Sequence, residues 1–125
     1  MNYKINYTKL LVVKTSGRMN AEDFIKMAED LLRHPYFSQN CNVVFDHTAL
    51  EFNKVSFDDL QKIRTFHKKN EEKIGNGKSA IVVNVGLSDG WHKLWSQGDK
   101  IKTGNITKVF ENYDNAISWI TKDDI

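Results

Sequence analysis

The sequence predicts a small α/β domain whose mixed sheet is mostly parallel. Two β-rich runs open the chain, and helical and strand patterns then alternate to its end, giving the order β-β-α-β-α-β-α-β-α. Strands that alternate with helices are typical of parallel sheets, because each helix carries the chain back to the edge where the next strand starts. The short connection between the first two runs predicts an N-terminal hairpin, so the first strand should be the antiparallel one.

A single domain across residues 1–125 fits the composition. The chain is 40% hydrophobic and 27% charged, which is typical of one globular domain with its own core. Cys41 is the only cysteine, so no disulfide within the chain is available. The opening stretch MNYKINYTKL lacks the apolar run of a signal peptide, and no apolar run is long enough to cross a bilayer. We therefore expect a cytoplasmic protein without a membrane span.

The first third of the chain follows two periodicities. Apolar and polar residues alternate over residues 2–7, and a β-rich run covers 9–15, which together predict the strands of the hairpin. A helix should then begin after the N-cap residue Asn20 and end before Pro35. Its apolar stripe has helical spacing and consists of Phe24, Met27, Ala28, Leu31 and Leu32.

Three strands and three helices complete the predicted fold. Residues 41–46 lack polar alternation, which is typical of a central strand with both faces covered. Ser56, with Asp59 three residues later, should cap a second helix that runs to about residue 72. A turn over residues 75–77 should precede a strand at 80–83. The remaining elements are a third helix capped by Ser88 that carries Trp91, Leu94 and Trp95, a strand over 106–110, and a last helix capped by Asp114.

Polar side chains follow the central strand at the edge of the sheet where open α/β folds bind ligands. Asp46, His47 and Thr48 come directly after the apolar run, and Ser56 opens the next helix. We interpret Asp46 to Thr48 as the polar exit of the strand, where Asp and Thr side chains commonly bond local backbone amides. The functional alternative is a partner-binding rim formed by Asp46, His47, Thr48 and Ser56.

Several short motifs resemble the SpoIIAA-like family, which belongs with the STAS domains (sulfate transporter and anti-sigma factor antagonist) and shares features with the lipid-binding Sec14 or CRAL-TRIO fold. They are Gly17 with NAED at 20–23, HPYF at 34–37, VVFDHT at 43–48 and VFENYDNAISWI at 109–120. Together with the element order, these motifs extend the resemblance over nearly the whole chain, mostly through caps and core positions. The resemblance implies a regulatory domain that acts by binding a protein partner.

Ser56 occupies a position that the resemblance makes significant. In regulatory STAS domains a partner kinase phosphorylates a serine at the start of the second helix, where free amides and the helix dipole favour a phosphate. That serine is usually followed by glycine, whereas Ser56 is followed by Phe57, and Asp58 and Asp59 would repel a phosphate. A plain N-cap, worth about 1 kcal/mol, also explains the position of Ser56. Both interpretations stay open.

Catalytic, metal and nucleotide sites find little support in the sequence. Asp46, His47 and Ser56 have the residue types of a hydrolytic triad, but neighbouring strand residues point to opposite faces and no G-x-S-x-G elbow occurs. An aspartate phosphoacceptor would need neighbouring acids to hold magnesium, and no acidic pair follows the first strand. The histidines are scattered, and neither glycine-rich nucleotide motif is present. We expect no metal, no cofactor and no enzymatic activity, with a small hydrolase as the least favoured alternative.

Charge and aromatic residues constrain the partners. The net charge of +2 is too small to imply nucleic acid, and the basic residues between 54 and 78 are not interleaved with base-stacking aromatics. Trp91, Trp95 and Phe57, together with Phe66 and Met27, would line an apolar pocket, pack in the core or form a dimer face. We expect a homodimer rather than a monomer, because an uncovered sheet face would favour self-association.

The predicted function is therefore a non-enzymatic STAS-like regulatory or protein-interaction domain, switched at the start of the second helix if Ser56 is a phosphoacceptor. The alternative is a small apolar-ligand or lipid-binding module of the Sec14 type.

Overall fold

The computed structural model describes residues 1–51, 56–84 and 106–122, which contain a five-stranded sheet in the order β1-β2-β3-β4-β5. β1 is antiparallel to β2, and each later pair of neighbours is parallel, so the predicted mixed sheet with an N-terminal hairpin is confirmed. β3 lies in the middle of the sheet, as its unbroken apolar run predicted. The strands are β1 (Asn2–Tyr7), β2 (Leu11–Arg18), β3 (Val43–Glu51), β4 (Lys78–Val82) and β5 (Ile106–Phe110).

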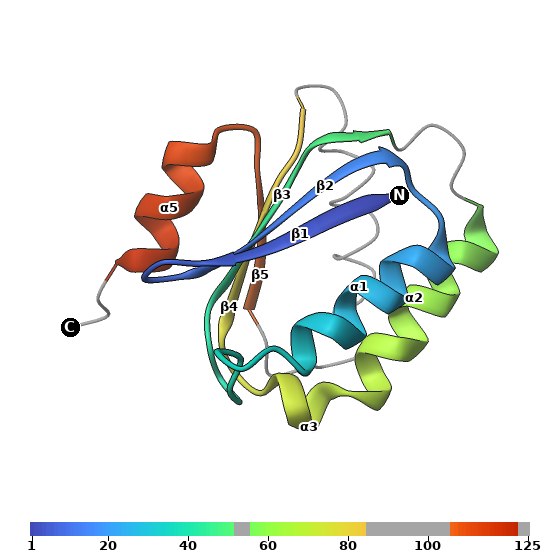
Figure 1. Ribbon diagram of the computed structural model, residues 1–125, viewed down its shortest axis with the longest axis horizontal. Helices are drawn as coiled ribbons and strands as arrows, with labels where there is room; N and C mark the ends of the chain where they lie inside the picture. The colour runs from blue at the N-terminus through green and yellow to red at the C-terminus, as the bar shows by residue number, and fades with distance from the viewer. Residues whose placement is uncertain (52–55, 85–105, 123–125) are drawn as a thin grey trace.

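Helices cover both faces of this sheet (Figure 1). α1 (Ala21–Leu32), α2 (Phe57–Lys69) and the short α3 (Glu71–Ile74) lie on one side, and α5 (Tyr113–Thr121) lies on the other. The predicted third helix, with Ser88, Trp91, Leu94 and Trp95, falls outside the described residues. The described part of the chain therefore has three layers, with the sheet in the middle.

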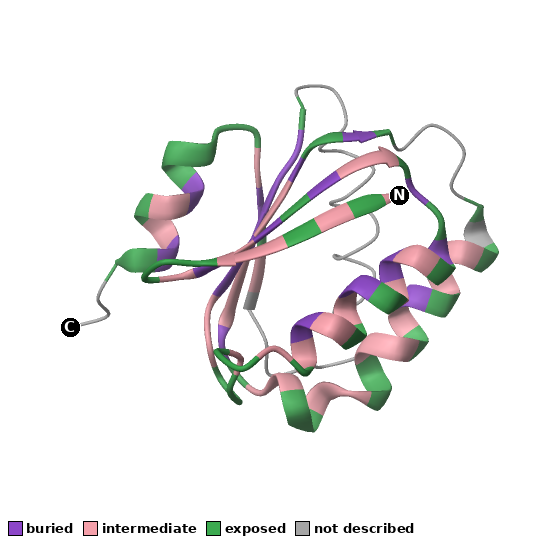
Figure 2. Ribbon diagram, viewed as in Figure 1, coloured by how far each residue is buried: buried purple, intermediate pink, exposed green. Residues whose placement is uncertain are grey.

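Each face of the sheet carries its own apolar core, because successive strand residues point to opposite faces. Val43 packs in the core beneath α1, whereas its neighbour Val44 packs in the core beneath α5. Figure 2 shows buried residues along the central strands and on the sides of α1 and α5 that face them. Met27 and Ile63 bring the facing sides of α1 and α2 into the first core.

Side-chain caps fix where two of the helices begin, as the sequence predicts. The Asn20 side chain accepts a hydrogen bond from the Asp23 amide at 2.8 Å. At α2, the Asp59 amide donates to the Ser56 hydroxyl at 3.1 Å, and the Ser56 amide donates to the Asp59 carboxylate at 3.2 Å. These two bonds form a capping box, which satisfies two amides that a helix N-terminus leaves open.

The end of α2 and the start of α5 differ from their predicted positions. α2 stops at Lys69 rather than near residue 72, because the Asn70 backbone leaves the helical region and its side chain bonds the Phe66 carbonyl oxygen at 2.8 Å. α5 is capped by Asn112, whose side chain accepts from the Asn115 amide at 3.0 Å, so Asp114 lies inside the first turn. The helix starts early because β5 ends at Phe110, close to Asn112.

β3 is longer than predicted and has no polar exit at residue 46. It runs to Glu51, because its second half continues along β2, with Ser16 opposite Ala49 and Arg18 opposite Glu51. β4 ends at Val82, opposite Asp46, so only β2 accompanies the second half of β3 among the described strands. The interpretation of Asp46 to Thr48 as a strand exit was therefore wrong.

A β-bulge interrupts the pairing of β2 and β3 where these polar residues lie. Lys14 is opposite Asp46 and Ser16 is opposite Ala49, so Thr15 faces the two residues His47 and Thr48. A bulge changes the direction of side chains and is common beside functional sites. Here the bulge lies beside His47, whose side chain is only 2% exposed in the middle of the sheet.

Candidate functional site

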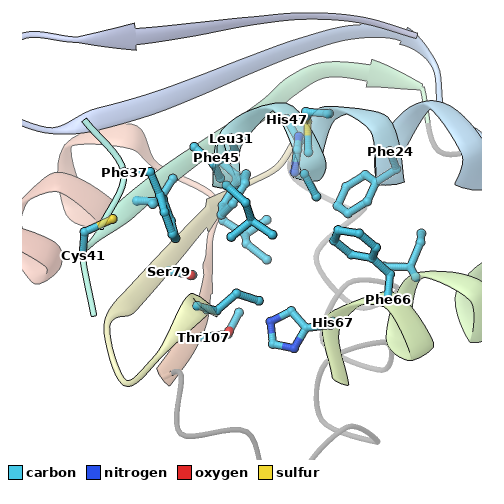
Figure 3. A pocket seen from close by; sticks show the side chains of 17 residues that line it. Phe24, Leu31, Phe37, Cys41, Phe45, His47, Phe66, His67, Ser79 and Thr107 are labelled. Atoms are coloured by element: carbon cyan, nitrogen blue, oxygen red, sulfur yellow. The ribbon is translucent and has the colours of Figure 1, made fainter. Parts of the chain in front are cut away.

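A partly open pocket with a cavity volume of about 70 Å³ lies between the sheet and the helices α1 and α2. Figure 3 shows the side chains that surround it. β3 contributes Phe45 and His47, because alternate strand residues point to the same face. α2 contributes Ile63 and His67, which are four residues apart and so lie on one side of the helix. The pocket is therefore lined by residues that share one face of β3 and by residues that share one side of α2.

Aromatic rings surround one part of this space, which we call the apolar end and define by Phe24, Met27 and Phe66. Figure 3 shows the rings of Phe24 and Phe66 facing each other from α1 and α2. The centroid of the Phe24 ring is 5.9 Å from that of His47, and the Phe45 ring lies 5.8 Å from His47 on the other side. The imidazole of His47 is therefore enclosed by aromatic carbon.

The imidazole of His47 lies against the hydroxyl group of Thr15. Its Nδ1 atom lies 2.6 Å from the hydroxyl oxygen of Thr15, which is itself only 4% exposed. Burial lowers the pKa of His47 from its ordinary 6.5 to about 3, although the negative charge of Asp46 acts in the opposite direction. The imidazole is therefore neutral at physiological pH. A neutral imidazole has one donor and one acceptor nitrogen, and it brings no charge to the pocket.

A second part of the pocket, which we call the polar end, is defined by Ser79, Thr107 and His67. Ser79 on β4 and Thr107 on β5 are direct partners in the parallel register, so they lie side by side on neighbouring strands. Figure 3 shows the His67 ring on the side of the pocket where Thr107 lies. Burial lowers the pKa of His67, and the nearby Glu71 partly opposes this shift. The polar end thus favours neutral hydrogen-bonding groups.

No Lys, Arg, Asp or Glu side chain occurs among the described residues that line the pocket. Cys41, the single cysteine, lies in the segment that connects α1 to β3. It lines the pocket and is partly exposed. Burial raises the pKa of its thiol, so the thiol is mostly protonated at neutral pH. The described residues also contain no group of three His, Cys, Asp or Glu side chains that would hold a metal ion.

The four residues predicted to form a rim lie in three different settings. His47 lines the pocket beneath α1, whereas the Asp46 carboxylate accepts bonds from the Thr48 amide at 3.1 Å and the Thr48 hydroxyl at 2.6 Å. The Ser56 hydroxyl is engaged in the capping box of α2. Asp46 and Thr48 are therefore brought together, while His47 and Ser56 each bond elsewhere. A role of these residues in partner binding stays a prediction.

The aromatic residues predicted to line a pocket fall into two groups. Met27 and Phe66 line the observed pocket, whereas Trp91 and Trp95 lie outside the described residues. Phe57 is the first residue of α2. Ser79, Thr107 and His67 were not predicted to line a pocket, because β4, β5 and the side of α2 meet only in the folded chain. For His67, the helical spacing from Ile63 was the one signal in the sequence.

The known proteins that resemble this chain do so through the fold. No family model and no curated protein matches the sequence. Among solved structures, the chain is similar to an uncharacterized protein of the DUF3478 family from Shewanella loihica PV-4, which has a SpoIIAA-like fold. The TM-score is 0.63 at 18% sequence identity, over 95% of this chain and 92% of that chain. The SpoIIAA-like fold that the motifs predicted is therefore confirmed. In addition, no helix within the described residues is long and apolar enough to cross a membrane.

Proposed function

We propose that this SpoIIAA-like domain is a non-enzymatic binding protein that holds a small, largely apolar ligand between the sheet and the helices α1 and α2. The observation that carries the proposal is the partly open pocket with its mostly apolar lining. Sites for small molecules have an apolar lining and a few polar groups that fix the orientation of the ligand.

The chemistry of the pocket favours binding over catalysis. Thr15 and His47 are hydrogen-bonded like a nucleophile and its general base, with 2.6 Å between Oγ1 and Nδ1. A general base works best when its pKa is near the operating pH, and burial holds the pKa of His47 at about 3. Such an imidazole would take up a proton from a hydroxyl only with great difficulty at neutral pH. The pair is better understood as a satisfied hydrogen bond inside the core.

The regulatory function predicted from the STAS resemblance gains no specific support at Ser56. Its hydroxyl accepts the Asp59 amide and so already serves as the N-cap of α2. A phosphate there would lie beside the carboxylate of Asp59, which bonds the Ser56 amide at 3.2 Å, and like charges repel. Phosphorylation, a protein partner, a homodimer and a cytoplasmic location therefore stay predictions.

Extraction of the purified protein tests the proposal. Protein produced in two different hosts is denatured, extracted with organic solvent and compared by mass spectrometry with its Ala28→Leu variant. Ala28 lines the pocket from α1, so a leucine there should fill part of the space and exclude the ligand. Lys26→Leu is the matched control, because it adds the same side chain at an exposed position of the same helix.

The proposal predicts an apolar compound in the wild-type and Lys26→Leu extracts and much less of it in the Ala28→Leu extract. Wild-type protein that is free of organic compounds from both hosts, and whose melting temperature no apolar extract raises, would contradict it. A ligand that binds the folded state must raise the free energy of unfolding, so the second readout does not depend on retention during purification.

A further inference from the structure

We propose that the hairpin formed by β1 and β2 binds an extended, acidic segment of a partner protein, which adds as a strand beside β1. This surface is separate from the pocket, so the inference goes beyond the proposed function. β1 forms one edge of the described sheet, and β2 is its only partner strand there (Figure 1). An edge strand offers backbone amide and carbonyl groups to a further strand, and extended peptides commonly bind at such edges.

The hairpin carries positive charge that its own sequence does not balance. Residues 1–17 contain three lysines and no Asp or Glu. Lys4 on β1, Lys9 in the turn and Lys14 on β2 are all exposed. Within the described part of the chain, none of the three forms an ion pair with a carboxylate. A segment with acidic side chains is therefore complementary in charge to this surface.

The positions of Lys4 and Lys14 cost stability in the isolated domain. The two residues are direct partners in the antiparallel register, and like charges directly opposite each other destabilise a sheet. A lysine on an edge strand protects against pairing with a second copy, which explains Lys4 but not Lys14, because β2 lies between β1 and β3. Asp46 is opposite Lys14 on β3, but its carboxylate bonds Thr48. An acidic residue beside Lys4 would relieve the repulsion between the two lysines.

The two faces of β1 define the pattern of side chains that the added strand needs. Exposed and half-buried residues alternate over residues 2–5 (Figure 2), and Tyr3 and Ile5 pack against the core beneath α1. Lys4 lies on the opposite face. The residue beside Lys4 should be acidic, and its neighbours should be apolar so that they cover the exposed parts of Tyr3 and Ile5. A segment in which acidic and apolar residues alternate matches both faces.

A protein segment fits this surface better than a nucleic acid or a membrane does. The side chains of β1 that share a face with Lys4 are those of Asn2 and Asn6. Neither is an aromatic ring that stacks on bases, and neither is an apolar group that enters a bilayer. Both are amides, which donate and accept hydrogen bonds with polar side chains of a neighbouring strand.

Binding of a short labelled peptide tests the inference. TEVEIET with fluorescein at its N-terminus is titrated with the full-length protein at low ionic strength, and binding is followed by fluorescence anisotropy. EEETTVI has the same composition without the alternation, and TKVKIKT reverses the charge. We expect TEVEIET to bind at least about tenfold more tightly than either control. If EEETTVI binds as tightly as TEVEIET, charge alone explains the binding and the inference is overturned.

Variants of the hairpin test the two lysines. Lys4→Glu should weaken the binding of TEVEIET about tenfold, and Lys14→Glu should weaken it several-fold because β2 is one strand further away. Lys68→Glu is the matched control, since it makes the same change of charge at an exposed position of α2. Equal affinities in the wild type and the three variants would overturn the inference.

Hydrogen exchange locates the peptide and distinguishes other occupants of the edge. Bound TEVEIET should slow the exchange of alternate amides of β1, because every second residue of an edge strand directs its amide outward. Protection only elsewhere in the protein would overturn the inference. Protection of β1 that follows protein concentration without peptide would overturn it in favour of a second copy. Phosphatidylserine vesicles or oligothymidylate that bind through Lys4, while TEVEIET does not bind, would overturn it in favour of a membrane or a nucleic acid.

Discussion

The buried imidazole of His47 predicts a specific loss of stability in acid. The unfolded chain takes up a proton on this histidine as the pH falls through 6.5, its ordinary pKa, whereas the folded chain resists protonation until about pH 3. Between these two values the unfolded state binds more protons, so the free energy of unfolding must decrease as the pH falls. The stability contributed by the neutral form is fully present above pH 6.5 and is lost progressively below it.

The size of the effect follows from the two pKa values. With 6.5 in the unfolded and about 3 in the folded state, proton linkage removes about 2 kcal/mol between pH 7.5 and pH 5. A small domain has a total free energy of unfolding of only about 5–15 kcal/mol, so this loss is readily measured. His67 acts in the same direction because burial also lowers its pKa. Its contribution cancels when variants at position 47 are compared.

Urea unfolding at the two pH values provides the assay. His47→Asn places an amide near the position of Nδ1 and removes the titration, so this variant should lose about 2 kcal/mol less than the wild type. Thr15→Val is the control, because it removes the hydrogen bond and keeps the imidazole buried. It should retain the wild-type pH dependence, since burial is the main cause of the lowered pKa. Equal pH dependence in the wild type and His47→Asn would show that His47 titrates normally and refute its placement in the core.

Four further variants test the local structure by urea unfolding. Ser56→Ala should cost about 1 kcal/mol through loss of the capping box, and an unchanged stability would contradict the cap. Asn112→Ala should also cost about 1 kcal/mol and more than Asp114→Ala, whereas the reverse order would restore Asp114 as the cap of α5. Gly77→Ala should destabilise by about 1–3 kcal/mol, because its Cβ would overlap the Cys41 carbonyl oxygen, and a wild-type midpoint would refute that close approach.

The arrangement of elements was predictable because the relevant signals are local. The helical spacing of Phe24, Met27 and Leu31 sets the buried face of α1, and these residues are indeed in the core. Ser56 and Asp59 stand at capping-box spacing, and the box forms. Hydrogen bonds and spacings within one element depend on neighbours in sequence, so a sequence pattern can report them.

The features that sequence did not predict depend on partners far along the chain. Asp46, His47 and Thr48 have the composition of a strand exit, but β2 continues beside them and keeps the strand extended to Glu51. Nothing in the local pattern reveals how long the neighbouring strand is. The pocket is similar, because Thr107 and His67 belong to elements that only the folded topology places around one space. Its polar end could not be identified before the register of β4 and β5 was known.

Protection of Cys41 by a bound ligand tests most directly whether the space between the sheet and α1 and α2 is a binding site. Cys41 is the only cysteine and lines the pocket, so its alkylation by N-phenylmaleimide reports on the site alone. The neutral apolar dye N-phenylnaphthylamine should slow the reaction in a saturable manner, and Ala28→Leu should reduce this protection while Lys26→Leu should not. A rate that is unaffected by saturating dye, in wild-type protein that is folded, would contradict ligand binding in this pocket.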